Sequence, residues 1–150
     1  MGWADQIAPV TSYASLSGAG RSLIHERNIA DVAVRALLDD RHDGRRYVLT
    51  GPETLTQREQ VRVIGEVIGR PLRTEEQSPD EFGDQWADAL AYWATLVDDP
   101  EPVTHTVPDL TGVPARTFRE WATDHAADFR QRTTSASRST WSSSGVVGSR

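Results

Sequence analysis

The sequence has 150 residues, a length that suits a single domain. Its 16 basic residues, all arginine, and 22 acidic residues give a net charge of −6, which argues against non-specific nucleic-acid binding because that binding depends on basic side chains. The absence of cysteine excludes disulfides, thiolate metal sites and cysteine nucleophiles.

The first helix is expected at residues 28–40, after a weakly patterned start. Residues 15–21 are rich in Ser and Gly and are typical of a loop, and residues 22–24 follow as a short strand. Asn28 is a favourable N-cap. Apolar residues then recur at the spacing of one buried helix face: Ile29, Val32, Ala33, Ala36 and Leu37.

Residues 47–50 have the composition of a buried strand. The run Tyr-Val-Leu-Thr favours β structure, and it is continuously apolar through Leu49 instead of alternating. Such a run is typical of a strand that is covered on both faces in a parallel sheet. A glycine–proline pair then ends the strand.

A second helix begins at a capping box. Thr56 and Glu59 have the spacing at which each side chain bonds the backbone N–H of the other, and Gly69 is a C-terminal stop. Residues 72–77 follow as an edge strand. The order strand, helix, strand, helix, strand over residues 22–77 predicts a mainly parallel α/β sheet with crossover helices.

The remaining ordered residues are expected to be helical. Residues 79–97 carry Trp86 and Trp93 in an apolar stripe, and residues 114–130 carry Trp121. Aromatic residues at helical spacing are expected in the core, and the alternative is that these three line an apolar ligand pocket.

The composition changes at the C-terminal end. Residues 133–150 contain seven Ser and three Thr and no acidic residue. We therefore expect the folded domain to occupy residues 1–130 and a disordered Ser/Thr-rich tail to occupy residues 131–150.

The sequence offers no dinucleotide-binding turn. Gly18-Ala19-Gly20 is the only Gly-x-Gly, the third glycine position is Leu23, and neither a clear strand nor a helix flanks the turn. We assign no cofactor-binding residue. Because the chain has no lysine, a Tyr-x-x-x-Lys proton-transfer pair cannot exist, and we assign no catalytic residue.

His25 is the one residue for which a substrate contact is proposed from the sequence. It lies just before the first predicted helix, in a stretch where a strand can end, and ligands bind at the carboxyl ends of strands in α/β sheets. The alternative is a turn residue in a polar tripeptide. His125, on an apolar helix face, is expected to be packed in a core or an interface.

The chain shows no pattern of a membrane or metal-binding protein. No stretch approaches the ~18 apolar residues of a membrane span, residues 1–10 lack the pattern of a signal peptide, and no histidine pair has metal-ligand spacing. We expect a soluble, cytoplasmic protein without a membrane, nucleic-acid or metal partner.

Four segments resemble the NmrA-like proteins, which are NAD(P)-binding members of the atypical short-chain dehydrogenase type. They occur in the order of that family and span roughly residues 3–130, although the family commonly has Asp at the position of Asn28. The segments are SLIHERNIADVA (22–33), YVLTGPE (47–53) with Leu55-Thr56, the helix end IGRP (68–71), and residues 111–121 with TG, PAR and FREW.

The resemblance implies a fold and a function. The fold is a partial Rossmann-like parallel sheet, made of its late strands, with a C-terminal helical substrate region. The function is that of the C-terminal fragment of an NAD(P)H-dependent oxidoreductase, without its dinucleotide-binding loop and therefore without cofactor binding by this chain alone. Self-association through an exposed sheet edge and a non-catalytic, redox-sensing module that binds other proteins are the alternatives.

Overall fold

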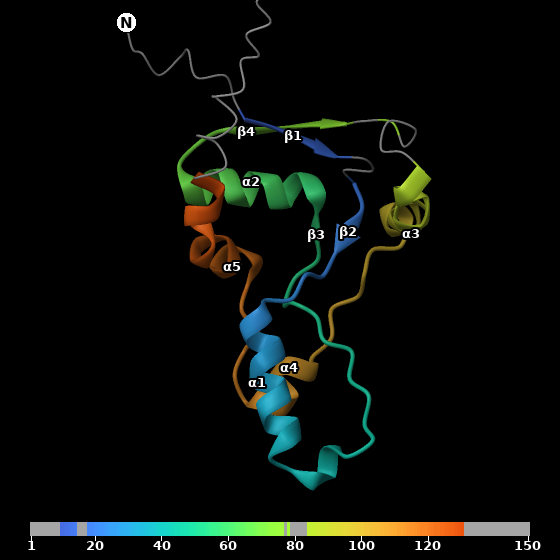
Figure 1. The fold of residues 1–150 in the computed structure, drawn as a ribbon, viewed down its shortest axis with the longest axis vertical. Coiled ribbons are helices and arrows are strands. Elements are labelled where there is room, and N and C mark those ends of the chain that lie inside the picture. Colours follow the sequence, from blue (N-terminus) through green and yellow to red (C-terminus); the bar gives the residue numbers. More distant parts are fainter. Residues whose placement is uncertain (1–9, 15–17, 77, 79–83, 131–150) are drawn as a thin grey trace, which may run out of the picture.

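The computed structural model describes residues 10–14, 18–76, 78 and 84–130. The predicted Ser/Thr-rich tail and the start of the helix predicted at residues 79–97 lie outside them. The described elements form an α/β fold of five α-helices and two small sheets, and the longer sheet lies at one edge of the described part (Figure 1).

The strands pair in two separate two-stranded sheets. β1 (Val10–Ala14) pairs with β4 (Leu72–Glu76) in parallel, with Val10 opposite Leu72 and Ala14 opposite Glu76. β2 (Gly20–Arg21) pairs with β3 (Leu55–Thr56) antiparallel. The predicted edge strand after the second helix is therefore confirmed as β4. Its partner β1 was not predicted, and β2 begins two residues before the strand expected at residues 22–24.

Helix α2 (Gln57–Ile68) forms where the capping box predicts it. The Glu59 backbone N–H donates to Thr56 Oγ1, and Glu59 accepts from the Thr56 backbone N–H at 2.8 Å. Gly69 ends the helix at φ 69°, in the left-handed region that favours glycine. Gly65 lets β4 approach, because a Cβ at this position would lie 2.9 Å from the Arg70 carbonyl oxygen.

The buried apolar core lies between α2 and α5 (Phe118–Asp124). Val63 of α2 packs with Phe118 and Ala122 of α5, and Trp121 stacks on Phe118 with 5.3 Å between ring centroids. Helix α5 begins at a second capping box, Thr117 and Glu120, four residues later than predicted. Trp121 therefore has the core role expected of it.

Helix α1 (Glu26–Leu37) starts two residues before the predicted helix. His25 is its N-cap, so the assignment of Asn28 as N-cap is wrong. Only the side that carries Asn28 and Val32 is buried, and this side packs against α4 (Thr106–Thr111). Leu37, predicted to be buried, is 85% exposed, because no described element covers that side of the helix.

Residues 47–50 do not form the predicted strand. Val48 is 70% exposed, and no strand among the described residues pairs with this segment. Thr104 Oγ1 donates to the Val48 carbonyl at 3.0 Å, and Gly51 fits closely against the backbone of Leu23. The prediction fails because a strand buried on both faces needs neighbouring strands to supply its hydrogen bonds.

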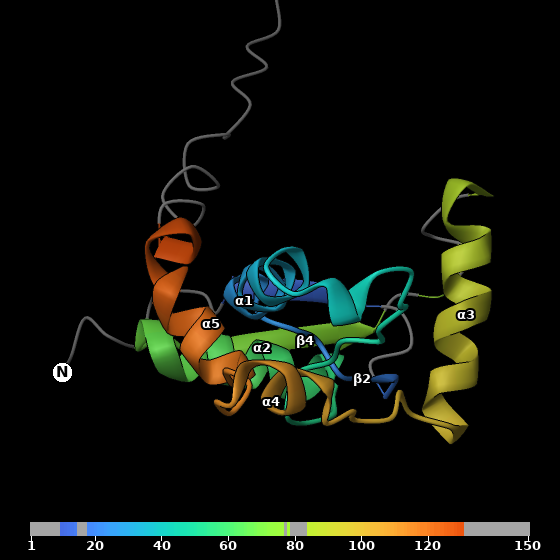
Figure 2. The same cartoon turned by 90° about the horizontal axis from the view of Figure 1, so that it is seen from below.

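Helix α3 (Ala87–Asp98) follows a short 3-10 turn (Asp84–Trp86) and stands at one side of the molecule (Figure 2). Trp86 and Trp93 contact each other with 6.4 Å between ring centroids. The longest described helices, α1, α2 and α3, have 12 residues each, and no helix in this part of the chain is long and apolar enough to span a bilayer.

We expect Phe118→Ala to lower the free energy of unfolding by about 3–5 kcal/mol, because it removes a buried ring from the α2–α5 core. Val34→Ala, at a position that is 55% exposed, should change it by less than about 0.5 kcal/mol. Urea unfolding followed by circular dichroism measures both values. Equal effects of the two substitutions would contradict this location of the core.

Candidate functional site

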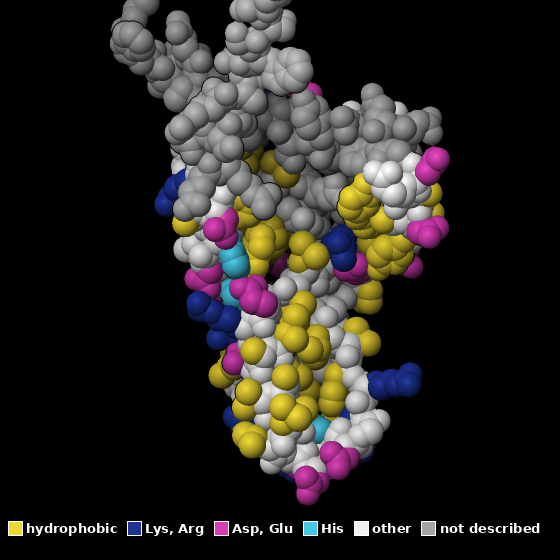
Figure 3. Space-filling view, in the orientation of Figure 1, with side chains coloured by type: hydrophobic (Ala, Val, Ile, Leu, Met, Phe, Trp, Pro, Cys, Tyr) yellow, Lys and Arg dark blue, Asp and Glu magenta, His cyan; other side chains and the backbone are white. Residues whose placement is uncertain are grey.

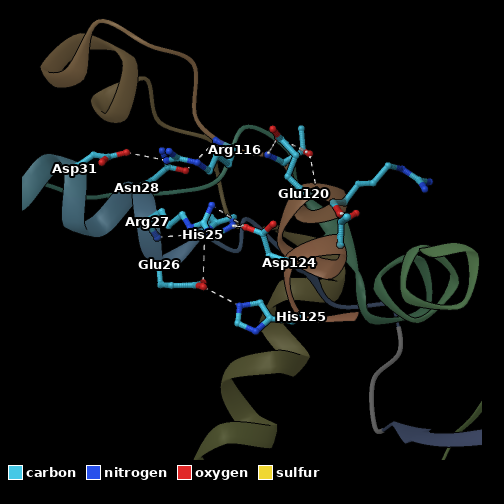
Figure 4. Close-up of polar contacts among 12 residues, drawn as sticks. His25, Glu26, Arg27, Asn28, Asp31, Arg116, Glu120, Asp124 and His125 are labelled. Carbon is cyan, nitrogen blue, oxygen red and sulfur yellow. Dashed lines mark hydrogen bonds and ion pairs between the residues drawn. The ribbon is translucent and has the colours of Figure 1, made fainter. Parts of the chain in front are cut away.

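The N-terminus of α1 meets the C-terminus of α5 at a buried histidine (Figure 4). The side chain of His25 is enclosed, and the residue is only 2% exposed. Its Nδ1 accepts a hydrogen bond from the Arg27 backbone N–H, and its Nε2 lies 3.2 Å from Asp124 Oδ2. Because Nδ1 accepts, Nε2 carries the proton and donates to Asp124. A contact of His25 with a substrate stays a prediction.

Charged side chains flank His25 on both helices. Arg27 Nη1 lies 3.2 Å from Asp124 Oδ2, and Glu26 Oε1 lies 2.7 Å from His125 Nε2. Basic groups and carboxylates therefore alternate where the N-terminus of α1 meets the C-terminus of α5. We name this set the α1–α5 clasp, and its members are His25, Glu26, Arg27, Asp124 and His125.

Two groups of the clasp have shifted pKa values. The hydrogen bond to Glu26 raises the pKa of His125 above its ordinary 6.5; burial opposes this shift and Asp128 adds to it. A hydrogen bond from its own backbone N–H, followed by the bond with His125, lowers the pKa of Glu26 below its ordinary 4.5. Both shifts favour the charged pair.

Asn28 connects α1 to the loop before α5. Its Oδ1 accepts from the Arg116 backbone N–H at 2.9 Å, and Arg116 Nη1 lies 2.8 Å from Asp31 Oδ2. Asn28 is fully buried, and its Nδ2 has no hydrogen-bond partner among the described residues. Asn28 and Asp31 are three residues apart, so they share a helix face.

Glu101 joins three separate parts of the chain. It accepts from the Ser22 backbone N–H at 2.9 Å and from the Tyr92 hydroxyl at 2.8 Å, and Arg21 Nε lies 3.4 Å away. Burial raises the pKa of Glu101, but these three donors together lower it further than burial raises it. Nothing in the sequence predicts this role, because Glu101 stands in an acidic turn without a motif.

Gly18-Ala19-Gly20 does not provide a cradle for a pyrophosphate. Gly20 lies in β2, and a Cβ at this position would come within 2.8 Å of Pro100 Cβ. The open side of this glycine is therefore filled by Pro100. Dinucleotide-binding turns use their second glycine to let the pyrophosphate approach the backbone, and that space is occupied here.

The N-termini of α1, α2 and α5 are occupied by the chain's own acceptors, whereas α3 and α4 have no side-chain cap but carry an aspartate in their first turns, Asp88 and Asp109. Anions bind at helix N-termini because backbone N–H groups there lack partners. His25 caps α1 and Glu26 lies in its first turn, while the capping boxes of α2 and α5 place Glu59 and Glu120 at theirs. The described residues therefore do not fit a dinucleotide phosphate, and they contain no cluster of three His, Asp or Glu residues able to hold a metal ion.

A groove of about 560 Å³ lies between α2 and β4. Its basic lining residues are Arg58, Arg62 and Arg70. Glu66 Oε1 lies 2.7 Å from Arg62, and Glu76 lies 3.6 Å from Arg58. None of the residues singled out in the sequence as site candidates lines this groove.

The chain is similar in sequence to reductases. It is 35% identical over 149 residues to the (4-alkanoyl-5-oxo-2,5-dihydrofuran-3-yl)methyl phosphate reductase of Streptomyces griseus. This match covers 86% of this chain and 50% of the relative. It is 39% identical over 124 residues to the NAD(P)H azoreductase of Xenophilus azovorans, and this match covers 75% of this chain and 43% of the relative. The chain spans about half the length of these curated relatives, and no protein-family model matches it.

The fold is similar to that of solved NAD(P)-binding proteins. An NADPH-dependent quinone oxidoreductase from Escherichia coli superposes with a TM-score of 0.59 at 16% identity, over 76% of this chain and 46% of that chain. The triphenylmethane reductase of Citrobacter, solved with NADP(H), superposes with a TM-score of 0.58 at 13% identity, over 77% of this chain and 44% of that chain.

These comparisons confirm the resemblance drawn from the sequence. The relatives that the chain matches are NAD(P)H oxidoreductases, matched over their C-terminal portion, and its fold is like that of solved NmrA-like, NAD(P)-binding epimerase–reductase proteins. The partial Rossmann-like fold class is likewise confirmed.

We expect His25→Ala to lower the free energy of unfolding by at least about 1 kcal/mol, since it removes the N-cap of α1 together with a buried hydrogen bond. His25→Asn should recover part of this loss, because an Asn side chain caps helices well. Chemical unfolding of the three proteins measures the difference. A larger loss in the Asn variant than in the Ala variant would contradict the capping role.

The clasp should also make stability depend on pH. The raised pKa of His125 means that its contribution is complete below pH 6.5 and is lost as pH rises through the folded pKa. The lowered pKa of Glu26 makes its contribution complete above pH 4.5 and lost as pH falls through its folded pKa.

We therefore expect the free energy of unfolding of the unmodified protein to fall from about pH 6 to about pH 8 more steeply than that of His125→Gln. Urea titrations at several pH values measure both profiles. Parallel profiles would show that the His125–Glu26 pair does not contribute.

Proposed function

We propose that this chain is the substrate-side part of an NAD(P)H-dependent reductase and that it acts together with a nucleotide-binding half of the kind its longer relatives possess. The observation that carries the proposal is the 35% identity to a reductase of which the chain covers only half. Both of these sequence relatives are reductases, which favours a catalytic assembly over a regulatory module that only binds other proteins.

The charges at the helix N-termini are the reason for assigning nucleotide binding to the other half. A pyrophosphate is an anion, and Glu26, Glu59 and Glu120 place a carboxylate in the first turns of α1, α2 and α5. An incoming phosphate would be repelled by a carboxylate that already uses the N–H groups it needs. The nicotinamide dinucleotide, which supplies a hydride when bound, is thus assigned to the other half of the enzyme.

In this proposal, the chain lines the substrate site and holds its helices in place, and it does not supply proton-transfer groups. In the described residues, His25 is used in capping α1, and both of its ring nitrogens have partners in the protein. By their names, the relatives act on an alkanoyl-oxo-dihydrofuranyl methyl phosphate and, in the azoreductase, on an azo compound, so the proposed substrate class for this chain is a small organic electrophile. A cytoplasmic location is part of the same proposal, because such a reductase needs the nicotinamide cofactor pool.

Titration with NADPH and NADH tests the proposal. We expect no saturable binding to the chain alone up to about 1 mM, the upper end of ordinary Michaelis constants. A fusion of this chain behind the portion of the Streptomyces griseus reductase that precedes the match should bind NADPH saturably in the micromolar range, with the parent reductase measured in the same assay as the reference. Micromolar binding by the chain alone, or none by a folded fusion, would refute it.

A further inference from the structure

The groove between α2 and β4 has the size of a small-molecule site. Its volume is about 560 Å³, and sites for small organic ligands have volumes of roughly 300–1,000 Å³. Apolar side chains and glycines form half of its lining: Val61, Gly65, Gly69, Pro71 and Leu72. Such a lining favours the apolar body of a ligand over water, and the polar groups of the groove then determine which polar group that ligand carries.

The groove concentrates positive charge in an acidic chain. Its ionisable lining residues are Arg58, Arg62, Arg70 and Glu66, whereas the whole chain has a net charge of −6. On the face shown in Figure 3 the arginine side chains (dark blue) stand at separate places, so three arginines around one groove differ from the pattern of that face. A groove of this charge attracts anions and repels cations.

Two of these arginines are paired with carboxylates of the chain itself. Arg58 lies 3.6 Å from Glu76, and Arg62 lies 2.7 Å from Glu66. Glu66 also accepts from Arg119 of α5. The hydrogen bond from Arg119 lowers the pKa of Glu66 below its ordinary 4.5; burial opposes this shift and Arg62 adds to it. Glu66 is therefore ionised at neutral pH and is shared by two arginines.

Arg70 is the arginine of the groove without such a carboxylate. Its backbone N–H donates to the Gly65 carbonyl at 3.0 Å, but its guanidinium has no hydrogen bond or ion pair in the part of the chain that the structure describes. The hydroxyl of Thr74, on β4, has no partner there either. Arg70 is half-buried, so its charge is partly removed from water and gains from a bound counter-ion.

We propose that this groove binds a small organic oxyanion, a molecule with an apolar body that carries a carboxylate or a phosphate group. The guanidinium of Arg70 suits such a group, because its planar set of N–H donors matches two oxygens at once. The Thr74 hydroxyl supplies a further donor, and the apolar lining receives the body of the ligand. The proposal is independent of the proposed function, since it needs neither a nicotinamide dinucleotide nor the other half of a reductase.

Four probes separate charge from apolar contact. Naphthoate and naphthyl phosphate carry the two oxyanions on one apolar body, naphthol has the body without the charge, and inorganic phosphate has the charge without the body. Each probe is titrated into the isotope-labelled full chain at neutral pH and followed by NMR. The backbone amide signals of Gly65, Gly69 and Leu72 report on the groove, and the tighter of the two naphthyl anions identifies the preferred oxyanion.

We expect at least one of the two naphthyl anions to shift these signals saturably, with a dissociation constant below about 1 mM. Naphthol and inorganic phosphate should each bind at least about 10-fold more weakly than that anion, because each lacks one of the two contacts. Equal binding of naphthol or of inorganic phosphate would overturn the proposal. So would dissociation constants above about 1 mM for both anions, or signals that shift with protein concentration alone, which would assign the groove to a second copy.

Arg70→Gln tests the group that carries the proposal. It should weaken binding of the preferred anion at least about 10-fold, because it removes a hydrogen bond between charged groups. Arg73→Gln is the matched control, since Arg73 is an exposed residue of the same strand as Thr74 and does not line the groove. Neighbouring side chains on a strand point to opposite faces, so this control should change the affinity less than about 2-fold.

Glu66→Gln should act in the opposite direction. It removes the acidic residue that lines the groove and leaves Arg62 without its counter-ion, so binding of the anion should become several-fold tighter. A variant that only damages the fold cannot bind the probe more tightly. Unchanged affinity in the Arg70 variant, or in a Glu66 variant with the amide spectrum of a folded chain, would refute the proposal.

Discussion

The rest of the structure depends on the packing of α2 between β4 and α5. Val63, Phe118 and Ala122 form the buried cluster at this contact, and Gly65 lets β4 come close on the other side. This packing places the end of α5 where Asp124 reaches His25, and so it holds the N-terminus of α1. Without it, α1 and α5 would be joined only by the clasp and by the contacts of Arg116 with Asn28 and Asp31.

The N-termini of α1, α2 and α5 are the places in the described residues where the chain's own side chains compete with an anionic ligand. The free N–H groups at a helix start bind either an anionic ligand or an acceptor of the chain itself. Here, capping boxes and a capping histidine take them at α1, α2 and α5. These caps stabilise a set of helices around a small core, and the same caps compete with a phosphate at these three N-termini.

The candidate site was predictable from the sequence only in part. His25 stood out by its position before a helix, but its partner Asp124 lies 99 residues away, and no local signal connects the two. Asn28 was assigned as a cap because Asn caps helices often, and the true cap is three residues earlier. Glu101 carried no motif at all, since its role comes from three donors that only the folded chain brings to it.

The sequence by itself determined α2 and its ends and the edge strand β4, because capping boxes, stop glycines and periodicity act between residues a few positions apart. Only the tertiary structure decided that residues 47–50 pair with no described strand and that no described element covers one side of α1. The physical reason is that burial belongs to a pair of surfaces. An apolar pattern indicates that a surface seeks cover, and the presence of a neighbouring element decides whether it is covered.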